Sequence, residues 1–153
     1  EHRLGHILAN AGIDQSNIDH KLGKETVLLL PKNPNKSAKR IKEHIENLTG
    51  KSIGVIITDS IGRPWRLGTI GHAIGASGVK TIVDLRQQGT DLYGRELQTT
   101  VIGLADQIAS AATLIMGESN EGKPIVLVKG IDMPSDSDTV DDLIRPKEED
   151  LFR

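Results

Sequence analysis

The sequence contains no cysteine, which excludes disulfide bonds and thiolate metal ligands and agrees with a cytoplasmic protein. Aromatic residues make up only 2% of the chain, so stacking platforms for single-stranded nucleic acid are not expected. The formal net charge of -2 gives no basis for binding nucleic acid or a membrane surface through bulk charge. No run of 18 apolar residues and no signal-peptide pattern occurs, so we expect no membrane partner.

What the sequence does contain fits a globular protein. Its 153 residues suffice for one domain with its own core, and 26% charged and 37% hydrophobic residues are ordinary proportions. We therefore expect a single domain over residues 1–153. The chain begins at Glu1 rather than at a methionine, which fits either a fragment or a processed product.

Hydrophobic patterns predict short strands alternating irregularly with two helices. Short apolar runs predict strands at residues 27–31, 53–57, 80–83 and 124–128, and residues 3–9 alternate weakly. Helical spacing of apolar residues predicts helices at about 36–48, with Ala38, Ile41, Ile45 and Leu48 on one face, and at about 101–116. The strands are too few for a long array of alternating strands and helices. We therefore predict an α+β fold with a mixed sheet and flanking helices.

The acidic end of the chain, residues 132–153, has no regular pattern and is predicted to be irregular. Four apolar side chains are expected to hold it against the core: Leu143, Ile144, Leu151 and Phe152.

The most informative stretch is residues 54–68, where the strand predicted at 53–57 delivers Asp59 to its carboxyl end. A carboxylate at a strand end is suited to a divalent metal. Gly62 permits close backbone approach to a ligand, and Arg63 and Arg66 offer planar forks for phosphate or carboxylate. These residues fit a site for an anionic, phosphorylated substrate. They fit equally a turn in which Asp59 and Arg63 form a surface ion pair.

Two further segments carry weaker signals. Residues 69–78 contain four glycines and resemble a phosphate-binding loop in composition, but they match neither the Walker nor the dinucleotide pattern. Close backbone packing explains those glycines as well, and a lone His72 is more typical of structure than of catalysis. The polar loop at residues 9–17, which includes Asn10, is explained by local turn chemistry or by a polar binding site. In the second helix, Asp106 and Gln107 stand in the early turns, where Asp106 is either a ligand or solvent-facing.

Several blocks occur in order and with natural spacing along almost the whole chain: residues 9–17, 27–31, 55–66, 73–78, 91–97, 104–106 and 142–146. Together they resemble one family, the coenzyme F420-0:L-glutamate ligases, which are the γ-glutamyl ligases of F420 biosynthesis.

The resemblance implies an enzyme that uses GTP and Mg²⁺ or Mn²⁺ to join L-glutamate to F420-0. The acceptor carboxylate is activated as an acyl phosphate, and the amine of glutamate then displaces the phosphate. The family fold is α+β, and its members form intertwined homodimers. The implied partners are therefore F420-0, L-glutamate, GTP and a second copy of the chain.

The resemblance also implies roles for particular residues. Asp59 matches a metal ligand, Asp106 is the second candidate ligand, and Gln107 and Glu96 are weaker ones. Gly62 and Asn10 are implied at the nucleotide, whereas Arg63 and Arg66 are implied to bind phosphate or carboxylate groups during catalysis.

Two departures from the family are visible. Gln107 stands where relatives often carry an acid, which weakens metal binding. Segments that the family carries before Glu1 and after Arg153 are also missing, so the sequence corresponds to the central portion of the ligase. The alternatives are a non-catalytic binding or assembly module of the same fold and, without the resemblance, a metal-dependent phosphate-handling hydrolase.

Overall fold

The computed structural model describes residues 1–19 and 26–151. Two α-helices accompany two small sheets among these residues, which confirms the predicted α+β class. The strands are β1 (Val55–Gly62), β2 (Thr69–Ser77), β3 (Ile82–Asp84) and β4 (Val101–Gly103). The helices are α1 (Pro34–Thr49) and α2 (Leu104–Met116), with 3₁₀ turns η1 (Ala9–Gly12), η3 (Val140–Leu143) and η4 (Lys147–Glu149).

The central feature is a long antiparallel hairpin of β1 and β2, paired from Val55 opposite Ser77 to Gly62 opposite Thr69. The register shifts between Ile57 and Thr58, as at a β-bulge. β3 and β4 form a separate antiparallel pair. The described strands thus form two antiparallel sheets rather than the single mixed sheet that we predicted.

The hairpin is longer than the sequence predicted, and its second strand was not predicted at all. The strand predicted at 53–57 continues through Asp59 to Gly62, so Asp59 lies within β1 and not at its end. The glycine-rich segment 69–78 forms β2, which we had not predicted as a strand. Residues 101–103 form β4, and the helix predicted from 101 begins at Leu104.

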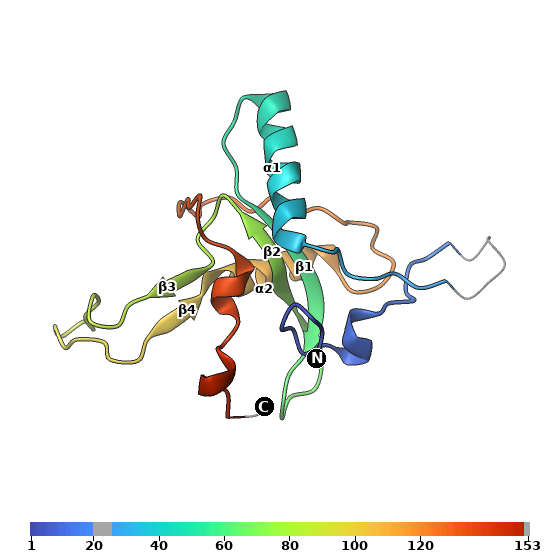
Figure 1. Ribbon diagram of the computed structural model, residues 1–153. Helices are drawn as coiled ribbons and strands as arrows, with labels where there is room; N and C mark the ends of the chain where they lie inside the picture. The colour runs from blue at the N-terminus through green and yellow to red at the C-terminus, as the bar shows by residue number, and fades with distance from the viewer. Residues whose placement is uncertain (20–25, 152–153) are drawn as a thin grey trace.

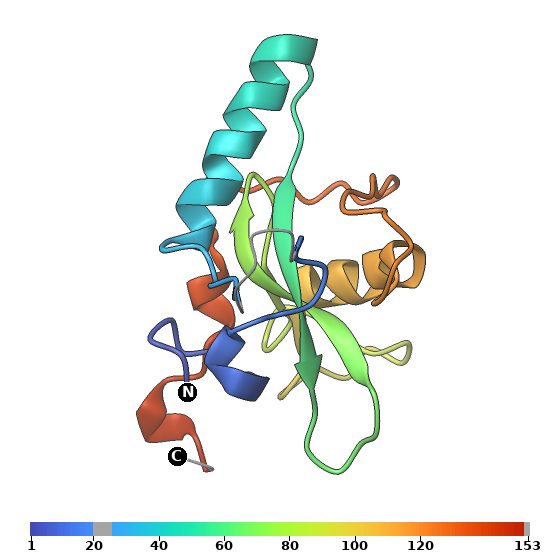
Figure 2. The same cartoon turned by 90° about the vertical axis from the view of Figure 1, so that its right-hand side faces the viewer.

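Both helices pack against β2, and α1 then projects beyond the sheet (Figures 1 and 2). Asn33 caps α1 by accepting a hydrogen bond from Lys36 N at 2.8 Å, and Gly50 ends the helix with a φ of 66°. Ala38 is fully buried, but Ile41 and Leu48 are 45% and 72% exposed. The predicted apolar face is therefore buried only at the N-terminal half of α1. Among the described residues, no helix is long and apolar enough to cross a membrane.

The interior is built from small side chains. The buried hydrophobic residues are Ala38, Ala73, Ile74, Ala76, Val79, Ala105, Ala109, Ala112 and Val140. Glycine extends this close packing, because a Cβ at Gly75 would lie 2.5 Å from the carbonyl carbon of Pro34 in α1. A Cβ at Gly71 would lie 2.8 Å from the carbonyl oxygen of Ala109 in α2. The packing explanation for the glycine-rich segment is thus confirmed.

Three predicted strands are wrong. Residues 124–128 belong to no strand, and Ile125 and Leu127 are 87% and 73% exposed. Residues 27–31 make only one isolated bridge, between Leu28 and Asp14, and Leu29 is 72% exposed. Residues 3–9 form a turn followed by the start of η1. Apolar composition suggested strands here, but a strand also requires a neighbouring backbone to pair with.

The C-terminal segment lies along the sheet through η3, where Val140 is fully buried and Leu143 packs against the core. Asn35 ties this segment to β2, because its Oδ1 accepts hydrogen bonds from Ala76 N (3.0 Å) and Val140 N (3.3 Å). Leu151 is 94% exposed, so its predicted burial is wrong. Phe152 lies outside the described residues.

Candidate functional site

Asp59 lies half-buried within β1, and its carboxylate and its backbone are each held by a hydrogen bond. Its Oδ1 accepts from the backbone N–H of Ser60 at 2.8 Å. Its carbonyl oxygen lies 3.1 Å from His72 Nδ1 on the paired strand. Among the described residues, Asp59 Oδ2 has no hydrogen-bond partner, and no ion pair joins Asp59 to Arg63. The alternative of a surface ion pair between these two residues is therefore not realised.

Asp106 is half-buried in the first turn of α2, where a negative charge is favoured by the helix dipole. Its Oδ1 accepts a hydrogen bond from Ala73 N at 2.9 Å, so it is neither mid-helix nor simply solvent-facing. Its second oxygen, like that of Asp59, has no hydrogen-bond partner within residues 1–19 and 26–151. Gln107, the next residue, is exposed.

Two consecutive residues of β2 therefore contact both candidate metal ligands. His72 contacts the backbone of Asp59, and Ala73 donates to the carboxylate of Asp106. No group of three or more histidine or acidic side chains in the described chain is close enough to hold a metal by itself. Mg²⁺ typically binds through one or two carboxylates together with water and substrate phosphates. Asp59 and Asp106 each keep one carboxylate oxygen without a hydrogen bond among the described residues, so each can offer one oxygen ligand to such an ion.

Arg63, Arg66 and Gly62 lie together at the turn between β1 and β2, as the sequence predicted. Arg66 N donates to Arg63 O at 3.4 Å, and Trp65 is 87% exposed with a φ of 57°. The Nε of Arg63 is buried and has no hydrogen-bond partner among the described residues. A buried cationic donor without an acceptor is costly, so this position suits an anionic ligand. Arg66 and Gly62 are exposed.

Two other predicted residues lie on different segments. Asn10 is exposed in η1 and adopts a left-handed conformation with a φ of 49°, as does Ala11 with 53°. Glu96 lies on the long arm between β3 and β4, which extends away from the hairpin in Figure 1. The tip of that arm presents Leu92 and Tyr93, which are 98% and 95% exposed. The structure thus does not bring Glu96 to the Asp59 region of the same chain.

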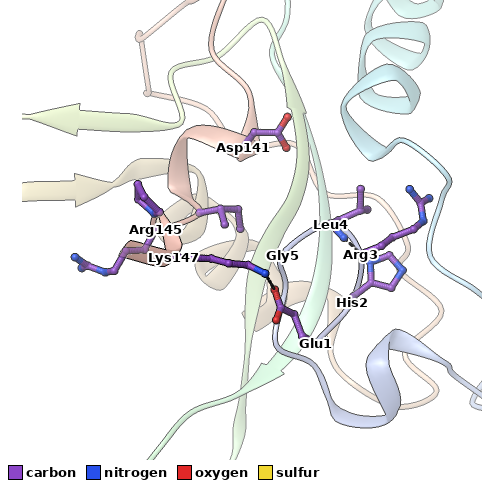
Figure 3. Close-up of a pocket in the computed structure, with 10 residues that line it drawn as sticks. Glu1, His2, Arg3, Leu4, Gly5, Asp141, Arg145 and Lys147 are labelled. Atoms are coloured by element: carbon purple, nitrogen blue, oxygen red, sulfur yellow. Dashed lines mark hydrogen bonds and ion pairs between the residues drawn. The ribbon is translucent and has the colours of Figure 1, made fainter. Parts of the chain in front are cut away.

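A hollow of about 740 Å³ lies elsewhere, between the first five residues and the turns at η3 and η4 (Figure 3). Its charged lining includes Arg3, Arg145 and Lys147, and Lys147 Nζ lies 3.9 Å from Glu1 Oε1. None of the residues that the sequence predicted for the metal, the nucleotide or catalysis lines it, although Ile144, Arg145 and Pro146 of the family-like block 142–146 do. We therefore place the candidate site at the β1–β2 hairpin, where oriented carboxylates and arginines occur, and not in this hollow.

The sequence analysis missed His6. It is 6% exposed, and its ring meets that of His72 edge-on, with centroids 5.5 Å apart and an interplanar angle of 74°. Burial lowers the pKa of His6, and nearby His72 and His2 lower it further, whereas Asp106 and Asp141 act in the opposite direction. No local motif predicts this pair, because its members are far apart in the chain.

Comparison with known proteins identifies the family of the chain. The family model described as F420-0:Gamma-glutamyl ligase matches residues 1–130. The coenzyme F420:L-glutamate ligase of Methanocaldococcus jannaschii is 49% identical over 153 residues, covering 100% of this chain and 59% of that protein.

More distant relatives match in the same way. The protein of the same name from Methanothermobacter thermautotrophicus is 44% identical over 156 residues, covering 100% of this chain and 60% of its own length. That of Methanosarcina mazei is 39% identical over 151 residues, covering 97% and 57%. The chain therefore spans somewhat more than half the length of these relatives. Since the family model covers most of the chain, the chain belongs to the F420-0:γ-glutamyl ligase family.

Proposed function

We propose that this chain carries the metal- and nucleotide-handling part of a ligase that joins L-glutamate to coenzyme F420-0 with GTP as co-substrate. The names of its relatives support the ligation of glutamate to an F420 species. The observation that carries the GTP and metal part lies at the hairpin and the start of α2. The carboxylate of Asp59 accepts a hydrogen bond from Ser60 N, and that of Asp106 accepts one from Ala73 N. The buried Nε of Arg63 has no acceptor among the described residues.

The proposed reaction has two steps. The acceptor carboxylate attacks the γ-phosphorus of GTP, so that GDP leaves and an acyl phosphate forms. The amine of glutamate then attacks the acyl carbon, the carbon–oxygen bond to phosphate breaks, and an amide and inorganic phosphate result. In each step negative charge builds up on the oxygens of the phosphate that leaves. Cationic groups close to these oxygens stabilise the charge and so lower the barrier.

The residues of the chain take complementary roles in this proposal. Asp59 and Asp106, with Gln107 as a weaker neutral ligand, would hold Mg²⁺ or Mn²⁺, which supplies charge neutralisation at the phosphates. Arg63 and Arg66 bind phosphate or carboxylate oxygens through their planar guanidinium groups. Gly62, without a side chain, leaves the strand end open to the nucleotide, and Asn10 offers an exposed amide to it.

A homodimer is part of the same proposal, and the exposed arm is consistent with it. Glu96 and the apolar tip residues Leu92 and Tyr93 extend away from their own hairpin, where they make no contact with Asp59. In a dimer, these side chains would pack against the surface of the second copy of the chain.

An alternative function follows from the length of the relatives. Because the chain covers 59% of the Methanocaldococcus jannaschii protein, it could supply fold and assembly while other residues bind GTP. Product analysis separates the candidates. The chain is incubated with F420-0, L-glutamate, GTP and Mn²⁺. We expect a glutamylated product; phosphate alone indicates a hydrolase, and no turnover indicates the non-catalytic module.

The role of Asp59 is tested by Asp59→Asn, which keeps the size of the side chain and removes its charge. We expect metal-dependent turnover to fall by about 100-fold or more, the scale on which loss of one electrostatic stabiliser lowers kcat. Circular dichroism should show an unchanged fold. The matched control is Asp132→Asn, an exposed carboxylate outside the hairpin, which should keep wild-type rates. Wild-type turnover in Asp59→Asn would remove this residue from the mechanism.

A further inference from the structure

His72 is buried at the middle of the hairpin and belongs to none of the roles assigned above. It is 7% exposed, faces the paired residue Asp59, and packs edge-on against the equally buried His6. His6 comes from the N-terminal segment, so the two rings join parts of the chain that are distant in sequence. Their packing holds the His72 ring in one orientation.

The hydrogen bond of His72 defines its protonation pattern. A carbonyl oxygen can only accept, so the Nδ1 that lies 3.1 Å from Asp59 O carries the proton. Nε2 is buried without a hydrogen-bond partner in the described part of the chain. An aliphatic side chain would fill this space without leaving a buried polar atom unpaired. The hydrogen bond from Nδ1 to the Asp59 carbonyl is therefore what a histidine provides at this position and an aliphatic side chain does not.

The position of this bond matters for Asp59. Its Oδ1 accepts a hydrogen bond from the N–H of Ser60, and its carbonyl oxygen accepts one from His72, so the residue is fixed on two sides. Loss of the bond from His72 would free the Asp59 backbone on one of these sides.

We propose that His72 is a positioning residue for Asp59, and this inference rests on the proposed function of Asp59 as a metal ligand. It acts through the Nδ1–H bond to the Asp59 carbonyl, with His6 as the ring that holds it in place. Groups that orient metal ligands from outside the coordination shell typically change metal affinity by about 10-fold to 100-fold when they are removed.

Two substitutions separate this role from simple packing. His72→Leu keeps an apolar side chain of comparable bulk and removes the donor, whereas His72→Asn keeps an N–H donor near the position of Nδ1. Calorimetric titration with Mn²⁺ should show affinity about 10-fold weaker or more in His72→Leu. His72→Asn should stay within about two-fold of the wild type because it retains the donor. If packing alone mattered, the smaller Asn would be the more damaging of the two.

Nitrogen-15 NMR of the histidine rings in the unaltered chain gives a test that does not depend on a variant folding. It should show His72 protonated at Nδ1, and an Nδ1 without a proton would overturn the proposal. Wild-type Mn²⁺ affinity in His72→Leu, or equal loss in both variants, would also overturn it. The two proposals fail differently: if Asp59→Asn binds Mn²⁺ as the wild type does, the metal site itself is wrong and the positioning role falls with it.

Discussion

At the scale of single residues, few polar side chains are buried. His6, His72 and Thr81 are the buried polar side chains of the described chain: His72 lies in β2 with its ring against that of His6, and Thr81 precedes β3. Buried polar groups are usually paired, because an unpaired one loses its hydration without compensation. Here His72 Nε2 and Thr81 Oγ1 have no partner among the described residues. Such groups persist where another requirement outweighs their cost.

The lowered pKa of His6 predicts a pH-dependent stability. The unfolded chain takes up a proton near pH 6.5, whereas the folded chain resists it because His6 is buried beside His72 and His2. Asp106 and Asp141 oppose this shift without reversing it. The unfolded state therefore binds more protons below about pH 6.5, and the free energy of unfolding should fall as the pH drops.

Urea denaturation between pH 7.5 and pH 5.5 measures this effect. The substitution His6→Phe keeps the edge-to-face ring contact and removes the titration, so its stability should change less over this interval. The control is His44→Phe on the exposed face of α1, which should keep the pH dependence of the wild type. An identical pH dependence in His6→Phe would show that His6 does not cause it.

At the scale of elements, the two helices were predictable and the sheet was only partly so. The spacing of apolar residues and Gly50 gave α1 to within two residues at its start and one at its end. β2 was missed because Gly71, Ala73 and Gly75 have low strand propensity, and their pairing is dictated by close packing with α1 and α2. Residues 124–128 have high strand propensity and yet lack a neighbouring strand in the described chain.

The candidate site, like the sheet, was only partly predictable from the sequence. Asp59, Arg63 and Asp106 could be selected from sequence, since each lies beside an element boundary or in a motif. The contacts of Asp59 with His72 and of Asp106 with Ala73 could not be predicted, because they depend on how β2 pairs with β1 and packs against α2. The bulge near Ile57 and Thr58 decides that facing, and nothing in the local sequence predicts it.

Close packing at β2 predicts the cost of adding one methyl group. In Gly75→Ala the new Cβ would lie 2.5 Å from a backbone atom of Pro34, which cannot move without shifting α1. We expect a loss of about 1–3 kcal/mol in the free energy of unfolding, as for other overpacked sites. Chemical denaturation followed by circular dichroism measures it.

The matched control is Gly103→Ala at the start of α2. A Cβ there would meet Leu143 Cδ2 at 3.6 Å, an ordinary van der Waals distance, so stability should change little. Equal stability of Gly75→Ala and Gly103→Ala would contradict the close contact between β2 and α1.

At the scale of the whole molecule, the exposed surface is large for the size of the chain. A compact monomer of 16.6 kDa exposes about 7,600 Å² by the usual scaling with mass, whereas this chain exposes 11,602 Å². The difference, about 4,000 Å² for one chain, exceeds the area of about 1,000–2,500 Å² that each partner of an obligate dimer usually buries. Large apolar side chains contribute to it, with Leu92, Tyr93, Leu114, Ile125 and Leu127 all more than 70% exposed.

This excess surface supports a prediction about association. We expect sedimentation velocity at micromolar concentration to show a dimer, because apolar surface of this extent is rarely left in water. The double substitution Leu92→Ser and Tyr93→Ser at the tip of the arm should shift the equilibrium towards monomer. A monomeric wild-type chain would contradict the dimer, and an unchanged dimer in the double variant would place the interface away from the arm.

The central claim is that the β1–β2 hairpin binds GTP through a divalent metal held by Asp59 and Asp106. Calorimetric titration of GTP into the chain, with and without Mn²⁺, tests it most directly. We predict that GTP binds with Mn²⁺ and binds at least 10-fold more weakly without it, on the scale of a lost metal bridge. Absence of GTP binding in the presence of Mn²⁺, or equal binding in its absence, would contradict this account of the hairpin.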